Sequence, residues 1–352
     1  MEDVARRAGV SLKTVSRVVN DSPHVAPETR KRVEGAVKEL DFHPHSGARS
    51  LARRRSGTVG VVAPLQAEGI FSRSFILETL AGAGQALGDA GYELVLIARS
   101  ASAPFIDLIK QRRVDGLLLM NVPIADPRVE ELQAAEVPFV LTCRPDVEGS
   151  PLDRAVRWVD ADHAHGASAA VEYLASLGHS RFAIVSGPWD LMVSRLREKG
   201  ARETLARLGL PAPAATLNGE FSIEAGVELG EALLAEQGST TAVLCGDDHL
   251  AIGIIQAARA RGLSVPGDLS VVGFDDIMFS AYVSPPLTTV RQPGREKGRL
   301  AAEMLLAIDS AGDDDPPAQV LLPTELVVRG STGPALTRRS AGGWRSRQRV
   351  SR

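Results

Sequence analysis

Two clusters of histidine and aspartate are the residues of this sequence best suited to binding a metal ion or catalysing a reaction. His163 and His165 lie two residues apart in a segment that also carries two aspartates, and residues 247–249 read Asp-Asp-His. Side chains two apart on a helix do not face the same way, because neighbours on one face are three or four residues apart. We therefore expect no metal site at either cluster.

The short motifs that mark common enzyme classes are missing or out of context. Gly-Ala-Gly at residues 82–84 lies inside a helical pattern and not after a strand, so it fails the context of a dinucleotide-binding loop. Neither a G-x-S-x-G nucleophile motif nor a phosphate-binding P-loop occurs. The acidic run at residues 313–315 precedes two prolines and is typical of a solvated turn. We therefore expect no enzyme activity, no cofactor and no metal.

The polar residues between positions 12 and 17 suit a different chemistry, which is hydrogen bonding to DNA. Lys13 and Arg17 can donate to O6 and N7 of guanine, and a good bidentate pair discriminates against a wrong base by roughly 1–3 kcal/mol. The hydroxyls of Thr14 and Ser16 suit phosphate contacts, which position a protein without reading the sequence. A small helical bundle with a solvated polar face would explain this spacing equally well.

A helix-turn-helix would position these residues. An apolar face within residues 2–8 is followed by a break at Gly9, and Ser11 can cap a second helix through its hydroxyl. Pro27 suits the first turn of a third helix. The apolar stripes of the three helices are Val4, Ala5 and Ala8; Val15, Val18 and Val19; and Val33, Ala36, Val37 and Leu40. Two short helices joined by a glycine-containing turn are the layout of a DNA-binding motif.

Residues 3–20 (DVARRAGVSLKTVSRVVN) and 25–33 (VAPETRKRV) resemble the N-terminal region of the lactose-repressor/galactose-repressor family. The resemblance implies DNA binding, and by it Leu12, Lys13 and Arg17 match the base-reading positions of the recognition helix. The DNA-contacting residues that we expect are Leu12, Lys13, Thr14, Ser16, Arg17, Asn20, Ala48, Arg49, Leu51 and Arg53.

The headpiece departs from the family pattern at three places. Lys13 stands where many relatives carry a small residue, so the operator sequence is open. Relatives usually carry a few more residues before the first helix, so we expect either an earlier start or the loss of contacts from that end. Ala26 replaces the usual hydroxyl cap before Pro27, which should cost about 1 kcal/mol of helix stability.

A short basic segment, residues 48–55 (ARSLARRR), follows the third predicted helix. In the family that it resembles, this segment is a hinge that becomes helical on the operator, and the resemblance implies that Leu51 enters the minor groove. An inserted apolar side chain unstacks a base step, and the kinked duplex then meets more protein. Arg49 and Arg53 would offset phosphate charge and make binding depend on salt. A plain basic linker is the alternative.

From residue 58 the pattern changes to short β-branched runs that alternate with longer amphipathic segments. The strands that we expect are 59–64, 92–98, 116–120, 139–143, 182–186, 242–245 and 269–273. The helices that we expect are 75–90, 104–112, 164–177, 195–208, 223–236, 250–261 and 295–311. This alternation predicts parallel sheets covered on both faces, with enough chain for two lobes. Ligands of such sheets bind beyond the carboxyl ends of the strands, here in a cleft between the lobes.

Four segments of this region, residues 178–188, 270–276, 286–293 and 326–332, also resemble the sensor domain of the same family. The resemblance implies a fold like that of periplasmic sugar-binding proteins. By it, Arg197 holds effector oxygens, Asp275 accepts from effector hydroxyls or ring nitrogens, and Phe221 stacks on the ligand. Further effector-binding candidates are Asp247, which favours donor-rich ligands such as polyols, and, with weaker support, Phe75, Trp189 and Asp160. The loop at residues 65–74 is longer than the family pattern and should lie at the cleft mouth.

Charge is segregated along the 352 residues, although the net charge is only −3. Residues 1–55 hold 12 Lys and Arg against 7 Asp and Glu, and residues 335–352 hold 6 Arg and no acid. A basic end on an acidic body suggests that the end meets a polyanion, whereas residues 338–352 are best explained as a disordered, solvated tail. No run approaches the roughly 18 apolar residues of a membrane helix. Cys143 and Cys245 lie in apolar runs, which predicts buried free thiols.

These features together predict an α/β protein with an N-terminal helix-turn-helix three-helix headpiece and a two-lobed, periplasmic-binding-protein-like sensor with parallel sheets. The expected parts are a headpiece (1–45), a hinge (46–57), an effector-binding and dimerisation domain (58–334) and a basic tail (335–352). We expect a cytoplasmic transcriptional regulator, acting as a repressor, that binds double-stranded operator DNA as a homodimer, with a tetramer as the alternative, and no membrane.

The expected effector is a sugar or polyol, and the alternative is a purine or nucleoside. Two other classes of protein use the same α/β scaffold. A solute-binding protein for transport would carry an export signal, and a hydrolase or nucleosidase would carry a catalytic constellation. The sequence shows neither feature.

Overall fold

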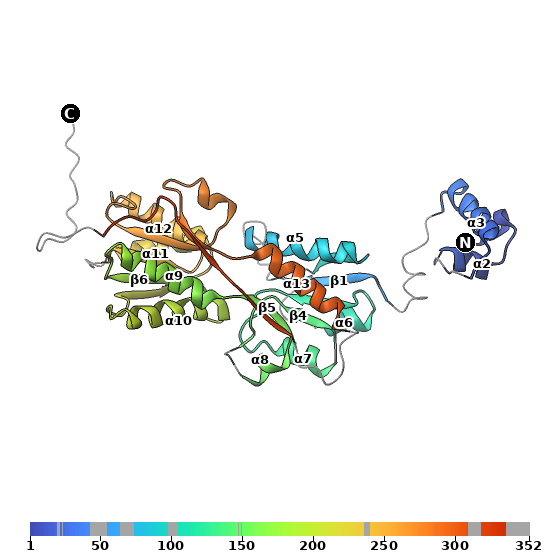
Figure 1. Ribbon diagram of the computed structural model, residues 1–352, viewed down its shortest axis with the longest axis horizontal. Helices are drawn as coiled ribbons and strands as arrows, with labels where there is room; N and C mark the ends of the chain where they lie inside the picture. The colour runs from blue at the N-terminus through green and yellow to red at the C-terminus, as the bar shows by residue number, and fades with distance from the viewer. Residues whose placement is uncertain are drawn as a thin grey trace, which may run out of the picture. The chain divides into compact units, whose positions relative to one another are not determined.

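The structure is a computed structural model that describes residues 1–19, 22, 24–42, 55–63, 74–97, 105–146, 148, 150–235, 240–308 and 318–335. These residues form two compact units, of which the first contains residues 1–58 with 107–115 and the second the rest of the chain (Figure 1). Several predicted positions lie outside the described residues: Asn20, Ala48, Arg49, Leu51 and Arg53, the long loop up to residue 73, and the basic tail from residue 336.

The first unit contains the three predicted helices, α1 (Glu2–Ala8), α2 (Leu12–Val19) and α3 (Pro27–Glu39). Helix α1 ends at Gly9, whose φ of 64° is a left-handed conformation that glycine adopts without a Cβ clash. The Ser11 hydroxyl accepts a hydrogen bond from the Thr14 N–H at 3.2 Å and so caps α2 as predicted. Residues of all three helices form the buried core: Val4, Ala5, Ala8, Val15, Val18, Val33 and Ala36. The helix-turn-helix layout is confirmed.

The second unit contains two six-stranded sheets. The first has β11 (Gln319–Leu322), β5 (Trp158–Ala161), β4 (Phe139–Leu141), β3 (Gly116–Leu119), β1 (Thr58–Val62) and β2 (Glu93–Ile97) in that order. The second has β12 (Glu325–Val327), β10 (Thr288–Arg291), β9 (Ser270–Asp275), β8 (Ala242–Cys245), β6 (Phe182–Ser186) and β7 (Ala215–Asn218). Strand β12 runs antiparallel to β10, and β6 to β10 are parallel. The predicted α/β class is confirmed.

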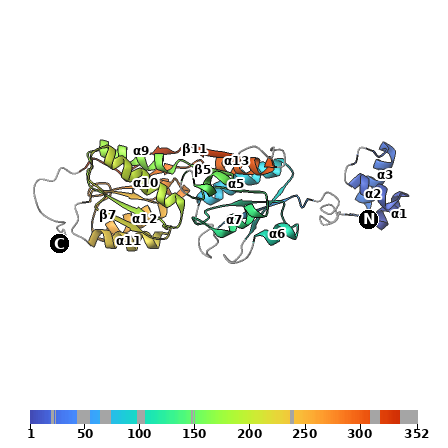
Figure 2. The same cartoon turned by 90° about the horizontal axis from the view of Figure 1, so that it is seen from below.

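Helices cover both sheets. Helices α5 (Ser74–Asp89) and α13 (Gly294–Leu306) pack against each other, and α13 also contacts β3, β4 and β5 of the first sheet. The pair α9 (His163–Ser176) and α10 (Met192–Arg207) lies on one side of the second sheet. The pair α11 (Ile223–Ala235) and α12 (Asp248–Ala260) lies on its other side (Figure 2). We call the first sheet with its helices the first lobe, and the second sheet with α9 to α12 the second lobe.

The chain passes between the two lobes at three places in its sequence. Strand β5 belongs to the first sheet, but α9, which begins two residues later, packs on the second. Strand β10 belongs to the second sheet, whereas the following α13 packs on the first. Strands β11 and β12 belong to different sheets although two residues separate them. Residues 161–163, 291–294 and 322–325 are therefore the crossings, and any motion between the lobes must pass through them.

Every strand and helix predicted for this region is present, with ends that shift by a few residues. The elements that the pattern missed are β5, β7, β10, β11, β12, α7 (Pro127–Ala134), α8 (Pro151–Ala155) and the 3-10 helix η1 (Met278–Ala281). They are short, and β7, β11 and β12 lie at sheet edges with half-exposed side chains, so no continuous apolar run marks them. A short predicted helix at 104–112 is α6 (Ile106–Lys110).

Two smaller expectations concern the thiols and the membrane. Cys143 and Cys245 are buried and free, as predicted, and burial raises the pKa of Cys143 to about 12. Within the described part of the chain, no helix is both long enough and apolar enough to span a lipid bilayer.

The Gly-Ala-Gly segment lies in α5, and its first glycine serves helix packing. A Cβ at Gly82 would lie 1.9 Å from the carbonyl oxygen of Arg295, and a Cβ at Gly298 would lie 1.9 Å from that of Thr79. Because real Cβ atoms do not come so close to backbone, α5 and α13 can approach this closely only with glycine at both positions. A Cβ at Gly84 would meet only Leu94, at an ordinary 3.9 Å.

We expect Gly82→Ala to lower the free energy of unfolding by about 1–3 kcal/mol, because overpacking forces the two helices apart. Gly84→Ala is the matched control, and it should change stability little or raise it by up to about 1 kcal/mol through helix propensity. Urea unfolding followed by circular dichroism measures both. Equal losses in the two variants would contradict this role of Gly82.

Candidate functional site

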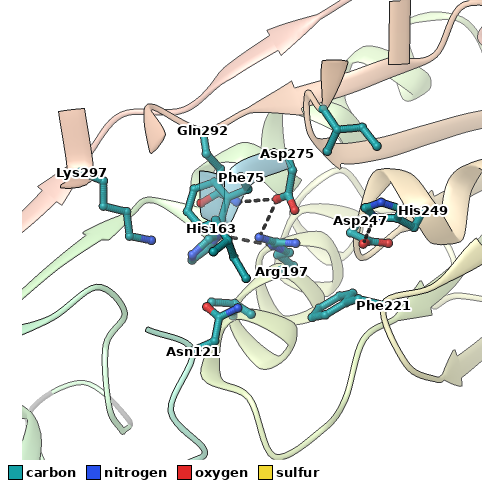
Figure 3. Close-up of a pocket in the computed structure, with 13 residues that line it drawn as sticks. Phe75, Asn121, His163, Arg197, Phe221, Asp247, His249, Asp275, Gln292 and Lys297 are labelled. Carbon is teal, nitrogen blue, oxygen red and sulfur yellow. Dashed lines mark hydrogen bonds and ion pairs between the residues drawn. The ribbon is translucent and has the colours of Figure 1, made fainter. Parts of the chain in front are cut away.

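A pocket of about 460 Å³ is lined by residues of both lobes. Phe75, Ile76, Asn121 and Lys297 come from the first lobe. Val193, Arg197, Phe221, Asp247, His249, Asp275 and Ile277 come from the second lobe. His163 and Gln292 come from the crossings, and Figure 3 shows these side chains directed toward a common space.

The strand ends explain why these residues meet. Asn121 lies two residues after β3, His163 two residues after β5, and Gln292 directly after β10, while Asp275 is the last residue of β9. Parallel strands present their carboxyl ends at one edge of a sheet, which is where ligands of such folds bind. The cleft predicted between the lobes therefore corresponds to this pocket.

Arg197 is held in place by three partners. Its Nη2 donates to Oδ1 of Asp275 at 3.1 Å, its Nε donates to Nδ1 of His163 at 3.3 Å, and its Nη1 donates to the carbonyl oxygen of Gly246. The guanidinium also lies 3.9 Å from the centre of the Phe274 ring. A buried arginine held at this many points presents its remaining N–H groups in one fixed direction.

Asp275 combines a strained backbone with a buried carboxylate. Its φ of 106° lies in a region that side-chain-bearing residues rarely adopt, and such strain concentrates at functional sites. Burial raises the pKa of Asp275, against the lowering effect of the Arg197 charge. Gln292 donates its amide N–H to the same oxygen of Asp275. The amide oxygen of Gln292, a residue of the pocket lining, is buried and has no hydrogen-bond partner among the residues that the structure describes.

Asp160 was predicted to contact an effector, but it does not line the pocket. Its carboxylate is 1% exposed and accepts hydrogen bonds from Lys297 Nζ at 2.8 Å and His163 Nε2 at 3.1 Å. Burial alone would raise the pKa of Asp160, but the Lys297 ammonium lowers it overall. Asp160 is thus a buried counter-ion behind the pocket wall, and Lys297 and His163 are the residues that reach the pocket.

His163 is neutral and has a defined tautomer. Burial lowers its pKa to about 4, with Arg197 and Lys297 adding to the effect and Asp160 opposing it. Its Nδ1 faces an Arg197 N–H, which can only donate, so Nδ1 is the acceptor and Nε2 carries the proton toward Asp160. Both ring nitrogens are thus engaged by protein groups, Nδ1 by Arg197 and Nε2 by Asp160.

The aromatic candidates divide into two groups. Phe221 and Phe75 line the pocket, and the Phe221 ring lies so close to Gly187 that a Cβ there would be 2.1 Å from it. The Lys297 ammonium lies 4.8 Å from the centre of the Phe75 ring. Trp189 was predicted as an effector contact, but it lies outside the pocket lining with 48% exposure, and the Arg195 guanidinium stacks on it. Its place in a turn after β6 exposes it to solvent.

The second histidine-aspartate cluster has structural partners. Asp247 lines the pocket, but one oxygen caps α12 through the Leu250 N–H and the other pairs with His249 Nδ1 at 2.9 Å. Asp248 is buried outside the lining and accepts from Ser280 and from the Ile277 N–H. Burial raises the pKa of Asp248 to about 8. Among the described residues, no group of three or more His, Cys, Asp or Glu is arranged to hold a metal ion.

Sequence reasoning missed eight residues of the lining, three of them apolar (Ile76, Val193 and Ile277) and five polar: Asn121, His163, His249, Gln292 and Lys297. The rule that ligands bind at the carboxyl ends of parallel strands would have found Asn121, His163 and Gln292, once β5 and β10 had been recognised. No local signal identifies Lys297, because a lysine on an amphipathic helix is normally solvated.

Helix α2 presents the predicted DNA-contacting residues on its exposed side. Leu12, Lys13 and Arg17 are exposed, and Thr14 and Ser16 are half-buried, whereas Val15 and Val18 face the core. An exposed leucine at the start of a helix next to two cations is a surface that can meet another molecule.

Comparisons with known proteins agree with this two-part organisation. Residues 1–45 match the family described as bacterial regulatory proteins, lacI family, and residues 171–332 match a periplasmic binding protein-like domain. The HTH-type transcriptional regulator CelR of Thermobifida fusca is 34% identical over 339 residues, which cover 94% of this chain and 97% of CelR. The ribose operon repressor of Escherichia coli strain K12 is 34% identical over 312 residues, covering 87% and 92%.

Solved structures show the same likeness. A complex described as transcriptional regulator CelR with cellobiose has a TM-score of 0.71 at 34% identity, covering 94% of this chain and 98% of that one. The lac repressor dimer bound to operator and the anti-inducer ONPF has a TM-score of 0.82 at 32% identity, with the same coverage.

Proposed function

The chain belongs to the lacI family of bacterial regulatory proteins, and from that premise we propose that a neutral sugar or polyol, bound between its two lobes, controls its affinity for operator DNA. The protein is a sequence-specific DNA-binding transcriptional regulator with a helix-turn-helix headpiece. The proposal extends to a cytoplasmic repressor without enzyme activity. It assigns residues 1–45 to the headpiece, 46–57 to a hinge, 58–334 to the sensor and 335–352 to a tail.

The observation that carries the sugar proposal is the unpartnered amide oxygen of Gln292 in the pocket wall. A buried acceptor without a donor costs about 1–3 kcal/mol, and a ligand hydroxyl would remove that cost. A hydroxyl both donates and accepts, so a polyol can also accept from Arg197 and donate to Asp275 or Asp247. Phe75 and Phe221 supply the apolar faces on which a sugar ring packs. The complex of CelR with cellobiose supports the same class of ligand.

The charges of the pocket favour a neutral ligand over an anionic one. Asp247 and Asp275 both line it, and the Arg197 charge is already paired with Asp275, while Lys297 is paired with Asp160. An added carboxylate or phosphate would meet two carboxylates and no unpaired cation among the lining residues described here. A purine would satisfy Asp275 through a ring N–H but would leave fewer hydroxyl partners for the remaining groups.

A thermal-shift screen of the full chain tests this proposal. Neutral sugars such as ribose and cellobiose, nucleosides and sugar phosphates are compared at equal concentration. A neutral sugar at 100 times its Kd should stabilise the sensor by about 2.7 kcal/mol, which raises the melting temperature by several degrees. A shift with nucleosides alone would favour the purine alternative, and no shift with any neutral sugar or polyol would overturn the proposal.

For the headpiece, we expect Arg17→Ala to weaken specific DNA binding by about 10- to 100-fold while non-specific binding falls far less. Arg17 is an exposed residue of α2, and loss of a bidentate guanine contact removes discrimination. The operator is obtained by selection from random double-stranded sequence, and the readout is Kd for that operator and for poly(dI-dC) at one salt concentration. Arg6→Ala, an exposed arginine of α1, is the matched control. Equal losses on both DNAs would mean that Arg17 touches only phosphate.

A homodimer is the expected assembly, and one surface favours it. The 3-10 helix η1 (Met278–Ala281) and the residue after it expose Met278, Phe279 and Tyr282, the last at 82%. Exposed large apolar side chains in a cluster mark protein interfaces, and a two-fold dimer would match a near-palindromic operator. The lac repressor, a similar protein, was solved as a dimer on its operator.

Sedimentation equilibrium of the wild type should give twice the chain mass, and Tyr282→Asp should shift the protein toward the monomer. Leu208→Asp, at an exposed leucine at the end of α10, is the control and should leave the mass unchanged. A monomeric wild type would contradict the dimer, and four times the chain mass would identify the tetramer.

A further inference from the structure

Six buried or half-buried side chains in and behind the pocket wall are joined in a row by five hydrogen bonds, which the backbone closes into a circuit. In order they are Lys297, Asp160, His163, Arg197, Asp275 and Gln292. Gln292 precedes Lys297 by five residues, so the backbone at the start of α13 closes the circuit. Figure 3 shows the part from His163 to Gln292.

The circuit connects the two lobes through two of the three crossings. Asp160 lies in β5 of the first lobe and His163 begins α9 of the second, so they flank the first crossing. Gln292 and Lys297 flank the start of α13, which follows the second crossing. Arg197 belongs to α10 of the second lobe, and its guanidinium group lies in the pocket wall. A shift of Arg197 can therefore reach both crossings through two of its hydrogen-bond partners, His163 and Asp275.

His163 is a rigid link in this circuit. The side chain is 1% exposed and its ring lies 5.7 Å from the Phe274 ring. Both of its nitrogens are engaged, Nδ1 with Arg197 and Nε2 with Asp160. The opposite tautomer would direct an N–H at the Arg197 N–H, so the ring has one protonation arrangement in this position. Because His163 has one arrangement of hydrogen bonds, we expect a displacement of Arg197 to shift the His163 ring and, with it, Asp160.

We propose that His163 is a positioning residue that relays effector occupancy at Arg197 to the buried Asp160–Lys297 pair, and through that pair to the crossings. This inference rests on the proposed function, because it requires a ligand on Arg197. A ligand that draws the guanidinium toward the pocket pulls on His163, and the imidazole passes the shift to the carboxylate on the other side of the first crossing. Coupling of this kind is a free energy shared by two sites and must be measured as such.

Two half-replacements of His163 separate its two bonds. The Asn side-chain oxygen lies roughly where Nδ1 lies, so His163→Asn keeps an acceptor for Arg197 and loses the bond to Asp160. The Gln side-chain nitrogen lies roughly where Nε2 lies, so His163→Gln keeps the donor to Asp160 and loses the acceptor. His165→Asn is the matched control, since His165 is exposed and lies two residues away on the same helix.

The first measurement is the ratio of the Kd values of a sugar for the operator-bound and the free full chain, with ribose and cellobiose as the probes. For the wild type we expect a ratio of about 5- to 150-fold, the usual size of an allosteric coupling. In His163→Asn the ratio should fall below about twofold, whatever the change in the Kd of the free protein, because His163 itself lines the pocket. In His163→Gln both the Kd of the free protein and the ratio should change. A purely structural role would lower the melting temperature and leave the ratio intact, and an unchanged ratio in His163→Asn would overturn the relay.

The second measurement needs no sugar and keeps the two proposals separable. Hydrogen–deuterium exchange of the free protein should become at least about threefold faster at residues 291–297 in both His163 variants and remain unchanged in His165→Asn. These residues are more than a hundred positions from His163 in the sequence, and the circuit links them to it by hydrogen bonds. Exchange that changes only around residues 160–166 would overturn the relay whether or not a sugar binds. A wild type that binds no sugar but shows the distant exchange change would overturn the effector class alone.

Discussion

Replacing Arg197 by methionine should weaken sugar binding by at least about 100-fold, the largest effect that we expect of any single change in the pocket. A hydrogen bond to a charged group is worth about 1.5–3 kcal/mol, and a guanidinium can give two of them to neighbouring hydroxyls. Methionine keeps much of the apolar stem and removes every donor. The same change also leaves the Asp275 carboxylate without its cation, so the pKa of Asp275, already raised by burial, should rise further.

Calorimetric titration with ribose and cellobiose measures this loss in the full chain. Arg195→Met is the matched control, because Arg195 lies on the same helix but stacks on the exposed Trp189 outside the pocket lining. Arg197→Lys should recover only part of the affinity, since an ammonium is a point donor and cannot form the same fork. If Arg195→Met and Arg197→Met lost affinity equally, the assignment of the pocket would be wrong.

The local parts of the fold could be predicted because their causes are local. Ser11 caps α2 because its hydroxyl accepts from the N–H of Thr14, three residues later in the sequence. The spacing of the valines in α2 defines the side of the helix that is buried. The strands with continuous apolar runs, such as β6 and β8, begin and end at the expected residues. Strand β5 reads Trp-Val-Asp-Ala, and a charged residue in a four-residue strand breaks the pattern that marks a buried strand.

The site was predicted in part because strand ends are visible in sequence but pairing partners are not. Arg197, Asp247, Asp275, Phe75 and Phe221 were expected in the cleft, and all five line the pocket. Asp160 was expected there as well, but its partner Lys297 lies 137 positions away and turns it into a buried counter-ion. Lys297 decides whether the Asp160 carboxylate is free to bind a ligand, and the periodicity of the sequence does not reveal that the two residues pair.

Lys297→Met should lower the free energy of unfolding by about 3–5 kcal/mol, because it leaves the Asp160 carboxylate buried without its cation. Both side chains are 1% exposed and their atoms lie 2.8 Å apart. Asp160 can escape the penalty only by taking up a proton, so the loss should be larger at pH 8 than at pH 5. Urea unfolding at the two pH values measures the difference.

The double variant shows whether the loss comes from an unpaired charge or from a cavity. Asp160→Asn combined with Lys297→Met should be more stable than Lys297→Met alone, since the amide carries no charge and can still accept from His163. Arg299→Met is the control on the same helix, where Arg299 pairs with Glu296 and Glu303 in solvent, and it should leave the unfolding midpoint nearly unchanged. If the double variant were no more stable than Lys297→Met, the lysine would act by filling space. A double variant as stable as the wild type would mean that the Asp160–Lys297 pair adds no net stability.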